Sequence, residues 1–322
     1  MTGSVADVAA AIRDRQTFIL TSHARPDGDA IGSQLALALA IDRLGKSTRL
    51  VDRDPVPAPY RVFPGIDRIE LANEVTGGAD AVIVLECGDL SRPELAGLDR
   101  CFVINVDHHL GNTMYGAVNW LDESAAACGE MVADLIDALG VAWTKEIATH
   151  LYLAIATDTG GFRHGKMSTR TFEAGRRIVA AGVDPAALSR QIFDSYGIGR
   201  VKLTGQLLNR MELFHDNRVA VLYFDDAVLQ ACDATVDDSE GLVNLPLGAE
   251  EILAVALFKR QSSNTLRVSL RSKGDIDVRA VAQLWAGGGH TNASGCTVTG
   301  AYDDVKKAVV DALGTQLRNS EF

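Results

Sequence analysis

Short apolar runs alternate with helix-like segments over the first half of the chain. Four runs have the length of strands and are apolar on both faces, at 17–22, 48–52, 81–86 and 101–106. Three further segments are helix-like, at 28–44, 124–139 and 145–157. In the last segment Ile147, Leu151 and Ile155 repeat every four residues and form one apolar face. The pattern predicts an α/β domain with a mostly parallel sheet flanked by helices.

The pattern changes near residue 215. Three later stretches are β-rich, at 218–224, 251–261 and 265–272, and the last of them alternates apolar and polar residues. A helical region at 168–190 and a connector at 196–214 that becomes a helix precede the change. We therefore predict a first domain over 1–190, a linker helix over 191–214 and a smaller α+β domain over 215–322.

Composition narrows the class of protein. The chain has 322 residues, 47% of them hydrophobic, and its length suits two domains. A formal net charge of −11 argues against a basic groove for long duplex nucleic acid. The chain lacks an apolar run of about 18 residues and a secretory signal, so we expect no membrane span and a cytoplasmic protein. Five scattered cysteines favour buried thiols over disulfides or a zinc site.

Acidic and histidine residues gather where the predicted elements end. Three strands are followed by the motifs "HARPDGDAIGS", "ECGD" and "DHH", and one helix is followed by "TDTGG". Because ligands bind at the carboxyl ends of parallel strands, we expect these motifs to meet at one edge of the sheet. Their acidic and histidine residues are His23, Asp27, Asp29, Glu86, Asp89, Asp107, His108, His109 and Asp158.

Carboxylates mixed with imidazoles are typical of divalent cation sites. Each motif alone fits a turn or a helix cap, but their joint position at the ends of neighbouring elements favours a metal site. The donor set suits Mn²⁺, with Mg²⁺, Co²⁺, Fe²⁺ or Zn²⁺ as alternatives. Two ions about 3.5–4 Å apart, bridged by one carboxylate, activate water for attack on phosphorus. The sequence therefore indicates phosphoryl chemistry.

The second domain contains a glycine triplet, Gly287, Gly288 and Gly289, followed by His290. Consecutive glycines let a backbone approach a ligand closely and offer N–H groups to an anion, although a flexible loop is the alternative. The strand 265–272 adds Arg271 and Ser272, which could hold a phosphate or a base. We expect an active site in a cleft between a metal-binding and an anion-binding domain.

These motifs together resemble the DHH phosphoesterase superfamily, in its DHH–DHHA1 subfamily and its oligoribonuclease/pAp-phosphatase (nanoRNase-like) type. The family motifs stand in order as "HARPDGDAIGS", "VLECGD", "VDHHLGN" and "TDTGGF", and the DHHA1 signature stands as "GGGHTNASG". By the resemblance, His23 and Asp27 would bind one metal ion, and Asp29, His108 and Asp158 the other.

The second motif departs from the family pattern. The family generally has aspartate where this chain has Glu86, so either Glu86 or Asp89 could supply the bridging carboxylate. The resemblance further implies that Asp107 orients a histidine and that His109 contacts phosphate or donates a proton. It implies that the glycine loop, with Arg271 and His290, holds the rest of the substrate.

The implied activity is release of nucleoside 5′-monophosphates from short RNA and removal of the 3′-phosphate from pAp. The substrates would be short oligoribonucleotides, pAp or dinucleotides. A cyclic-di-AMP or pApA phosphodiesterase is an alternative with the same metals, whereas a family II pyrophosphatase lacks the GGGH-bearing domain. The departure at Glu86 leaves a non-catalytic nucleotide-binding protein as a further alternative. The sequence does not fix the oligomeric state, although family members are often homodimers.

Overall fold

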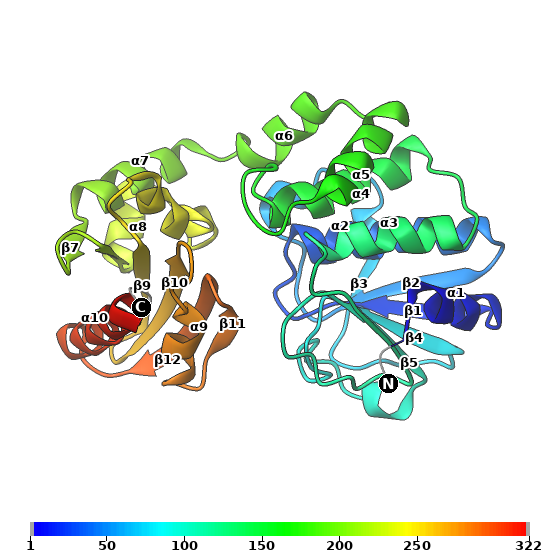
Figure 1. Ribbon diagram of the computed structural model, residues 1–322, viewed down its shortest axis with the longest axis horizontal. Helices are drawn as coiled ribbons and strands as arrows, with labels where there is room; N and C mark the ends of the chain where they lie inside the picture. Colours follow the sequence, from blue (N-terminus) through cyan, green and yellow to red (C-terminus); the bar gives the residue numbers. More distant parts are fainter. Residues whose placement is uncertain (1–2, 320–322) are drawn as a thin grey trace. The chain divides into compact units, whose positions relative to one another are not determined.

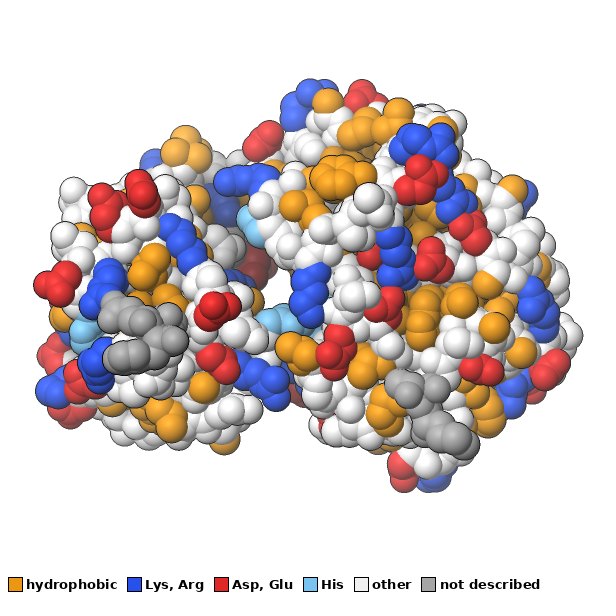
Figure 2. Space-filling view, in the orientation of Figure 1, with side chains coloured by type: hydrophobic (Ala, Val, Ile, Leu, Met, Phe, Trp, Pro, Cys, Tyr) orange, Lys and Arg blue, Asp and Glu red, His pale blue; other side chains and the backbone are white. Residues whose placement is uncertain are grey.

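The computed structural model describes residues 3–319, which form two compact units that meet between Ser195 and Tyr196: unit 1 precedes this boundary and unit 2 follows it. Each unit has one six-stranded sheet and its own hydrophobic clusters. No helix within the described range is long and apolar enough to cross a membrane. Figure 2 shows acidic and basic side chains intermingled on the face that it displays.

The sheet of unit 1 is entirely parallel (Figure 1). Its strand order is β3-β2-β1-β4-β5-β6. The chain adds strands on one side of β1 as far as β3 and on the other side from β4 to β6, so the order of addition reverses between β1 and β4. Ligands of open parallel sheets bind where the order reverses, beyond the carboxyl ends of the strands. The strands are β1 (Thr17–Thr21), β2 (Ser47–Asp52), β3 (Ile69–Leu71), β4 (Ala81–Leu85), β5 (Val103–Asp107) and β6 (Val118–Leu121).

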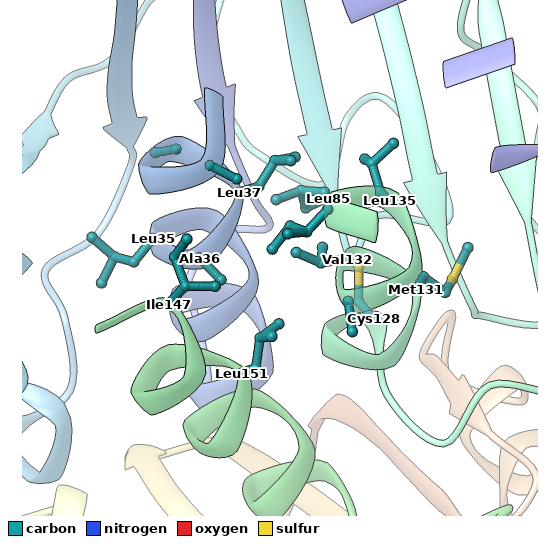
Figure 3. Close-up of a cluster of buried hydrophobic side chains, with 14 of the residues drawn as sticks. Leu35, Ala36, Leu37, Leu85, Cys128, Met131, Val132, Leu135, Ile147 and Leu151 are labelled. Carbon is teal, nitrogen blue, oxygen red and sulfur yellow. The ribbon is translucent and has the colours of Figure 1, made fainter. Parts of the chain in front are cut away.

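Helices α1, α2 and α3 pack on one side of this sheet, and α4 packs on α2 and α3. Figure 3 shows buried side chains of α2, α3 and α4, among them Leu37, Met131 and Leu151, in one cluster with Leu85 of β4. The opposite side is covered by loop residues such as Val75 and Leu95. Helices of unit 1 are α1 (Val5–Arg13), α2 (Gly28–Arg43), α3 (Cys128–Ala138), α4 (Lys145–Asp158), α5 (Thr169–Ala180) and α6 (Pro185–Phe193).

The sequence explains these elements locally. Phe18 and Leu20 of β1 enter the cluster under the helices, whereas Ile19 enters the cluster on the other side, as expected for a strand buried on both faces. Asp27 begins α2 by accepting a hydrogen bond from the Ala30 N–H, so a residue of the first acidic motif is also a helix cap.

Unit 2 contains a mixed sheet in the order β11-β12-β10-β9-β8-β7, in which only β8 and β9 run parallel among the described strands. Separate apolar clusters cover its two faces. The strands are β7 (Glu212–Phe214), β8 (Val219–Phe224), β9 (Ala254–Ser262), β10 (Thr265–Ser272), β11 (Gly288–His290) and β12 (Ala293–Thr299). The helices are α7 (Ile198–Asn209), α8 (Asp226–Cys232), α9 (Val278–Gln283) and α10 (Tyr302–Asn319).

The predicted fold class, a parallel α/β domain followed by a smaller α+β domain, is confirmed. The sequence pattern did not reveal the short strands β3 and β6. The helical region 168–190 is two helices, because the chain turns at Gly182 with φ +90°. The glycine triplet is not a free loop, since Gly288 and Gly289 pair with β12 as part of β11.

Candidate metal centre

The carboxyl ends of three strands bring most of the acidic and histidine residues together. His23 lies just beyond β1, Glu86 follows β4, and Asp107 is the last residue of β5. β1 and β4 are hydrogen-bonded neighbours, as are β4 and β5. The three residues therefore lie along one edge of the sheet, next to the point where the strand order reverses.

The turn between β1 and α2 places His23 beside Asp27. The Nδ1 atom of His23 donates to the carbonyl oxygen of Ala24 at 3.0 Å, which leaves Nε2 as the ring nitrogen available to a ligand. That Nε2 lies 3.9 Å from Oδ2 of Asp27, whose side chain is 55% exposed. The other oxygen, Oδ1, caps α2. One imidazole nitrogen and one carboxylate oxygen thus lie near each other at the edge of the sheet.

Asp29 is the second residue of α2 and is 1% exposed. Its carboxylate accepts hydrogen bonds from the N–H groups of Cys128 and Gly129, at 2.6 and 2.9 Å, and from the Ser33 hydroxyl at 3.0 Å. The first turn of α3 has no side-chain cap of its own, and Asp29 takes that role. Burial raises the pKa of Asp29 well above its usual value, and neighbouring carboxylates add to the rise.

Glu86 joins two histidines. Its Oε1 lies 3.2 Å from Nε2 of His108, and its Oε2 lies 3.1 Å from Nδ1 of His109. Burial opposes ionisation of Glu86, but the two histidines outweigh it and hold its pKa well below the usual value. The residue has φ +62°, a conformation that costs a non-glycine residue free energy and that is often found at functional sites.

The histidine pair is oriented by its neighbours. The Nδ1 atom of His108 donates to the carbonyl oxygen of Ala125 at 3.2 Å, which turns Nε2 toward Glu86. The Nδ1 atom of His109 lies 2.7 Å from Oδ1 of Asp107. Burial lowers the pKa of His109, but Glu86 and Asp107 outweigh it and raise the pKa to about 10.

Asp158, at the end of α4, completes the cluster. Its Oδ2 lies 3.6 Å from Nε2 of His108. Burial, with the charge of Glu86, raises the pKa of Asp158 to about 7 against the opposing charge of His108. Within the described residues of unit 1, two sets of three residues have their ligand atoms within 4.8 Å of one another: Asp29, His108 and Asp158, and Glu86, Asp107 and His109.

A cluster of buried carboxylates this dense favours a bound cation, because carboxylates near one another disfavour each other's ionised form. The donor set of oxygens and imidazole nitrogens suits a hard or borderline divalent ion such as Mn²⁺ or Mg²⁺. The residues present therefore fit the metal ions that the sequence motifs imply.

Asp89 lies in neither set. Its Oδ1 accepts hydrogen bonds from the N–H and hydroxyl of Ser91, at 2.9 and 2.6 Å, and its Oδ2 accepts one from the Thr113 hydroxyl at 3.2 Å. The Ser91 bonds lower the pKa of Asp89 despite its partial burial. This geometry is that of a turn-stabilising carboxylate.

The predicted substrate-binding residues on β10 of unit 2 lie on two different faces of the sheet. Arg267, Ser269 and Arg271 share one face of β10, since every second residue points the same way. Ser272 points to the other face, where its hydroxyl donates to the carbonyl of Ile276 at 2.6 Å and accepts from Asn292 at 2.9 Å. Burial lowers the pKa of Arg271.

Two of the three glycines are required by their own sheet. A Cβ on Gly287 would lie 2.3 Å from the Gly295 carbonyl oxygen, and a Cβ on Gly289, where φ is +135°, would lie 2.4 Å from that of Ala293. Gly288 has open space around its Cα. Gly288, two residues before His290, is exposed and is the position of the triplet where a larger group has room.

Several groups of the centre were not identified from the sequence. Asn112 donates to Oδ2 of Asp107 at 2.6 Å and to the carbonyl of Cys87 at 3.0 Å, and its place in "DHHLGN" was the available signal. The N–H groups of Cys128 and Gly129 and the carbonyl of Ala125 act through the backbone. Backbone groups leave no residue-type signal.

Comparisons with known proteins agree with this architecture. Residues 17–155 match the DHH family, N-terminal domain, and residues 216–319 match the DHHA1 domain. The bifunctional oligoribonuclease and PAP phosphatase NrnA of Thermus thermophilus is 32% identical over 317 residues, which cover 96% of this chain and 93% of that protein.

Solved structures show the same fold. An exopolyphosphatase-related protein from Bacteroides fragilis superposes with a TM-score of 0.90 at 25% identity, covering 97% of this chain and 95% of that one. The exonuclease RecJ bound to manganese has a TM-score of 0.55 at 13% identity, covering 98% of this chain and 95% of that one.

Proposed function

Because the chain belongs to the DHH family and carries a DHHA1 domain, we propose that it is a metal-dependent phosphoesterase acting on short RNA. It hydrolyses short oligoribonucleotides to nucleoside 5′-monophosphates and converts pAp to AMP. The observation that carries the proposal is the cluster of Asp29, Glu86, His108 and Asp158 at the carboxyl edge of a parallel sheet. The relative at 32% identity is named for both activities.

The proposed metal ligands form two groups that share Glu86. Asp29, His108 and Asp158 hold one divalent ion, and His23 and Asp27 hold the other. Glu86 supplies the shared carboxylate, because its side chain is buried in the cluster whereas Asp89 caps a turn. Mn²⁺ is the ion we propose. When bound, the two ions supply an activated water and neutralise charge on the reacting phosphate.

The remaining residues of the centre position substrate and proton. Asp107 holds Nδ1 of His109 at 2.7 Å and thereby sets the orientation of the ring. A ring held in this way and kept protonated by neighbouring carboxylates can donate a hydrogen bond to a phosphoryl oxygen or a proton to the leaving group. Asn112 fixes the other oxygen of Asp107, so the orientation is maintained from two sides.

Unit 2 is proposed to bind the part of the substrate that does not react. Arg271 supplies a cation for a phosphate, and the open backbone at Gly288, with His290, supplies donors for a second anionic group or a base. Ser272 keeps the turn after β10 in place through its bonds to Ile276 and Asn292. A homodimer remains part of the proposal and is tested by the molecular mass in solution.

The test is hydrolysis of a substrate panel. The purified protein is incubated with Mn²⁺ and, separately, a labelled RNA pentamer, pAp, pApA and cyclic-di-AMP. We expect mononucleotides from the pentamer and AMP from pAp. Cleavage confined to pApA or cyclic-di-AMP would assign a dinucleotide phosphodiesterase instead. Binding of Mn²⁺ and nucleotide without turnover of any substrate would contradict the proposal and indicate a binding protein.

A further inference from the structure

A buried carboxylate lies outside the proposed metal ligands. Asp52 is the last residue of β2 and is 1% exposed. Its Oδ1 accepts hydrogen bonds from Nε2 of Gln34 at 2.8 Å and from the N–H of Ser22 at 3.3 Å. Gln34 belongs to α2 and is also fully buried. Through Asp52, β2 thus contacts the end of β1, which precedes the turn carrying His23, and α2, which follows that turn.

This arrangement leaves two buried oxygens without a donor. Within residues 3–319, no hydrogen bond reaches Oδ2 of Asp52 or Oε1 of Gln34. A buried acceptor without a partner destabilises the folded state, and more so when it is charged. Both atoms are acceptors while Asp52 is ionised, so neither can satisfy the other. A proton on Oδ2 of Asp52 turns that oxygen into a donor. Oε1 of Gln34, the other oxygen without a partner, can then accept its hydrogen bond.

We propose that Asp52 is a neutral carboxylic acid that pairs with the Gln34 amide through two hydrogen bonds, and that this pair positions the turn carrying His23. Oδ1 accepts from Nε2, and the Oδ2 hydroxyl donates to Oε1. Burial raises the pKa of Asp52 to about 6, although hydrogen bonds from Gln34 and Ser22 and the charge of His23 oppose the rise. The additional bond to Oε1 stabilises the protonated form and raises the pKa further.

The pair connects both sides of the turn. Ser22, held through its N–H by Asp52, directly precedes His23. Gln34 directly follows Ser33, whose hydroxyl donates to Asp29 at 3.0 Å. A neutral pair holds these positions without adding another negative charge beside the clustered carboxylates. The positioning role rests on the proposed function, because that function assigns His23 and Asp29 as metal ligands. The hydrogen-bonded pairing of Asp52 with Gln34 does not depend on that function.

Four variants test the pairing: Asp52→Asn, Asp52→Ala, Gln34→Glu and the double variant Asp52→Asn/Gln34→Glu. The readouts are the melting temperature of the metal-free protein and the Mn²⁺ affinity by titration calorimetry. Asp52→Asn retains both hydrogen bonds as an amide–amide pair, so we expect a melting temperature close to wild type and an affinity within about threefold. Asp52→Ala removes both bonds, and we expect a lower melting temperature and an affinity loss of about 10- to 100-fold.

The double variant is the matched control. Gln34→Glu alone places two carboxyl groups together and is expected to lower both readouts. Adding Asp52→Asn exchanges acid and amide and is expected to restore them. A metal-free Asp52→Asn protein that melts as low as Asp52→Ala would overturn the proposal and assign Asp52 a charged role. Both readouts are made without substrate, so a wild type that binds Mn²⁺ but cleaves no RNA would contradict only the proposed function.

Discussion

At the scale of the residue, Glu86 and Asp89 give a matched comparison within one loop. Glu86 contacts two histidines in the buried cluster, whereas Asp89 bonds to Ser91 and Thr113. We expect Glu86→Gln to lower kcat/KM for the RNA pentamer by about 100-fold or more, because it removes the charge shared by the two proposed ions. Asp89→Asn is expected to stay within about threefold. Equal losses in steady-state assays would argue against Glu86 as the shared ligand.

His150 makes a separate residue-scale prediction about stability. It is fully buried in α4, and burial lowers its pKa to about 4. The unfolded chain binds this proton at higher pH than the folded chain, near the usual value of 6.5. The contribution of neutral His150 to the free energy of unfolding is therefore fully present above about pH 6.5, and it is lost as the pH falls toward 4. The loss at pH 5 is about 2 kcal/mol.

Urea unfolding of metal-free wild type and His150→Met at pH 7 and pH 5 measures this loss. The apolar side chain does not titrate, so the difference in unfolding free energy between the two proteins should shift in favour of the variant by about 2 kcal/mol at pH 5. A difference that is the same at both pH values would show that His150 is already solvated or charged in the folded state.

At the scale of the element, the crossing of α2 and α4 depends on Gly32. A Cβ there would lie 2.5 Å from the His150 carbonyl oxygen and 2.7 Å from the Ala154 nitrogen, both backbone atoms. We expect Gly32→Ala to separate the helices, to destabilise the protein by about 1–3 kcal/mol and to weaken Mn²⁺ binding, since α4 ends at Asp158.

Gly205→Ala is the control for this prediction. Gly205 also lies inside a helix, α7, but nothing lies within 4 Å of an added Cβ. Alanine there should stabilise the protein by about 0.5–1 kcal/mol, because glycine is the poorer helix former. Chemical denaturation of both variants gives the comparison. Stabilisation of both would mean that α2 and α4 tolerate a wider crossing.

At the scale of the whole molecule, the two units have separate hydrophobic clusters, and the proposed ligands lie in unit 1. We expect calorimetry to resolve two transitions and Mn²⁺ to raise only one of them. At 100-fold excess over Kd, binding adds about 2.7 kcal/mol, or about 5–10 °C for a unit of this size. Chelation by EDTA should reverse the shift. An equal rise in both transitions would indicate that metal binding couples the units.

The motifs and the class of fold follow from the sequence for a physical reason. Apolar runs such as that of β1 and helical spacing such as that of α4 reflect burial, which acts on local patterns that a sequence displays directly. Polar residues placed after parallel strands must meet at one edge of the sheet, so the proximity of Glu86 and His108 was predictable from the sequence.

The tertiary structure decided which of two similar residues enters the cluster. Glu86 and Asp89 are three positions apart in one loop, and only the φ of +62° at Glu86 and the packing around it direct that side chain to the histidines. Likewise, only the approach of β12 shows that a side chain at Gly287 or Gly289 would meet the backbone of that strand, whereas one at Gly288 would not. Residue types determine the chemistry that is available, whereas contacts between distant segments determine which groups are free to perform it.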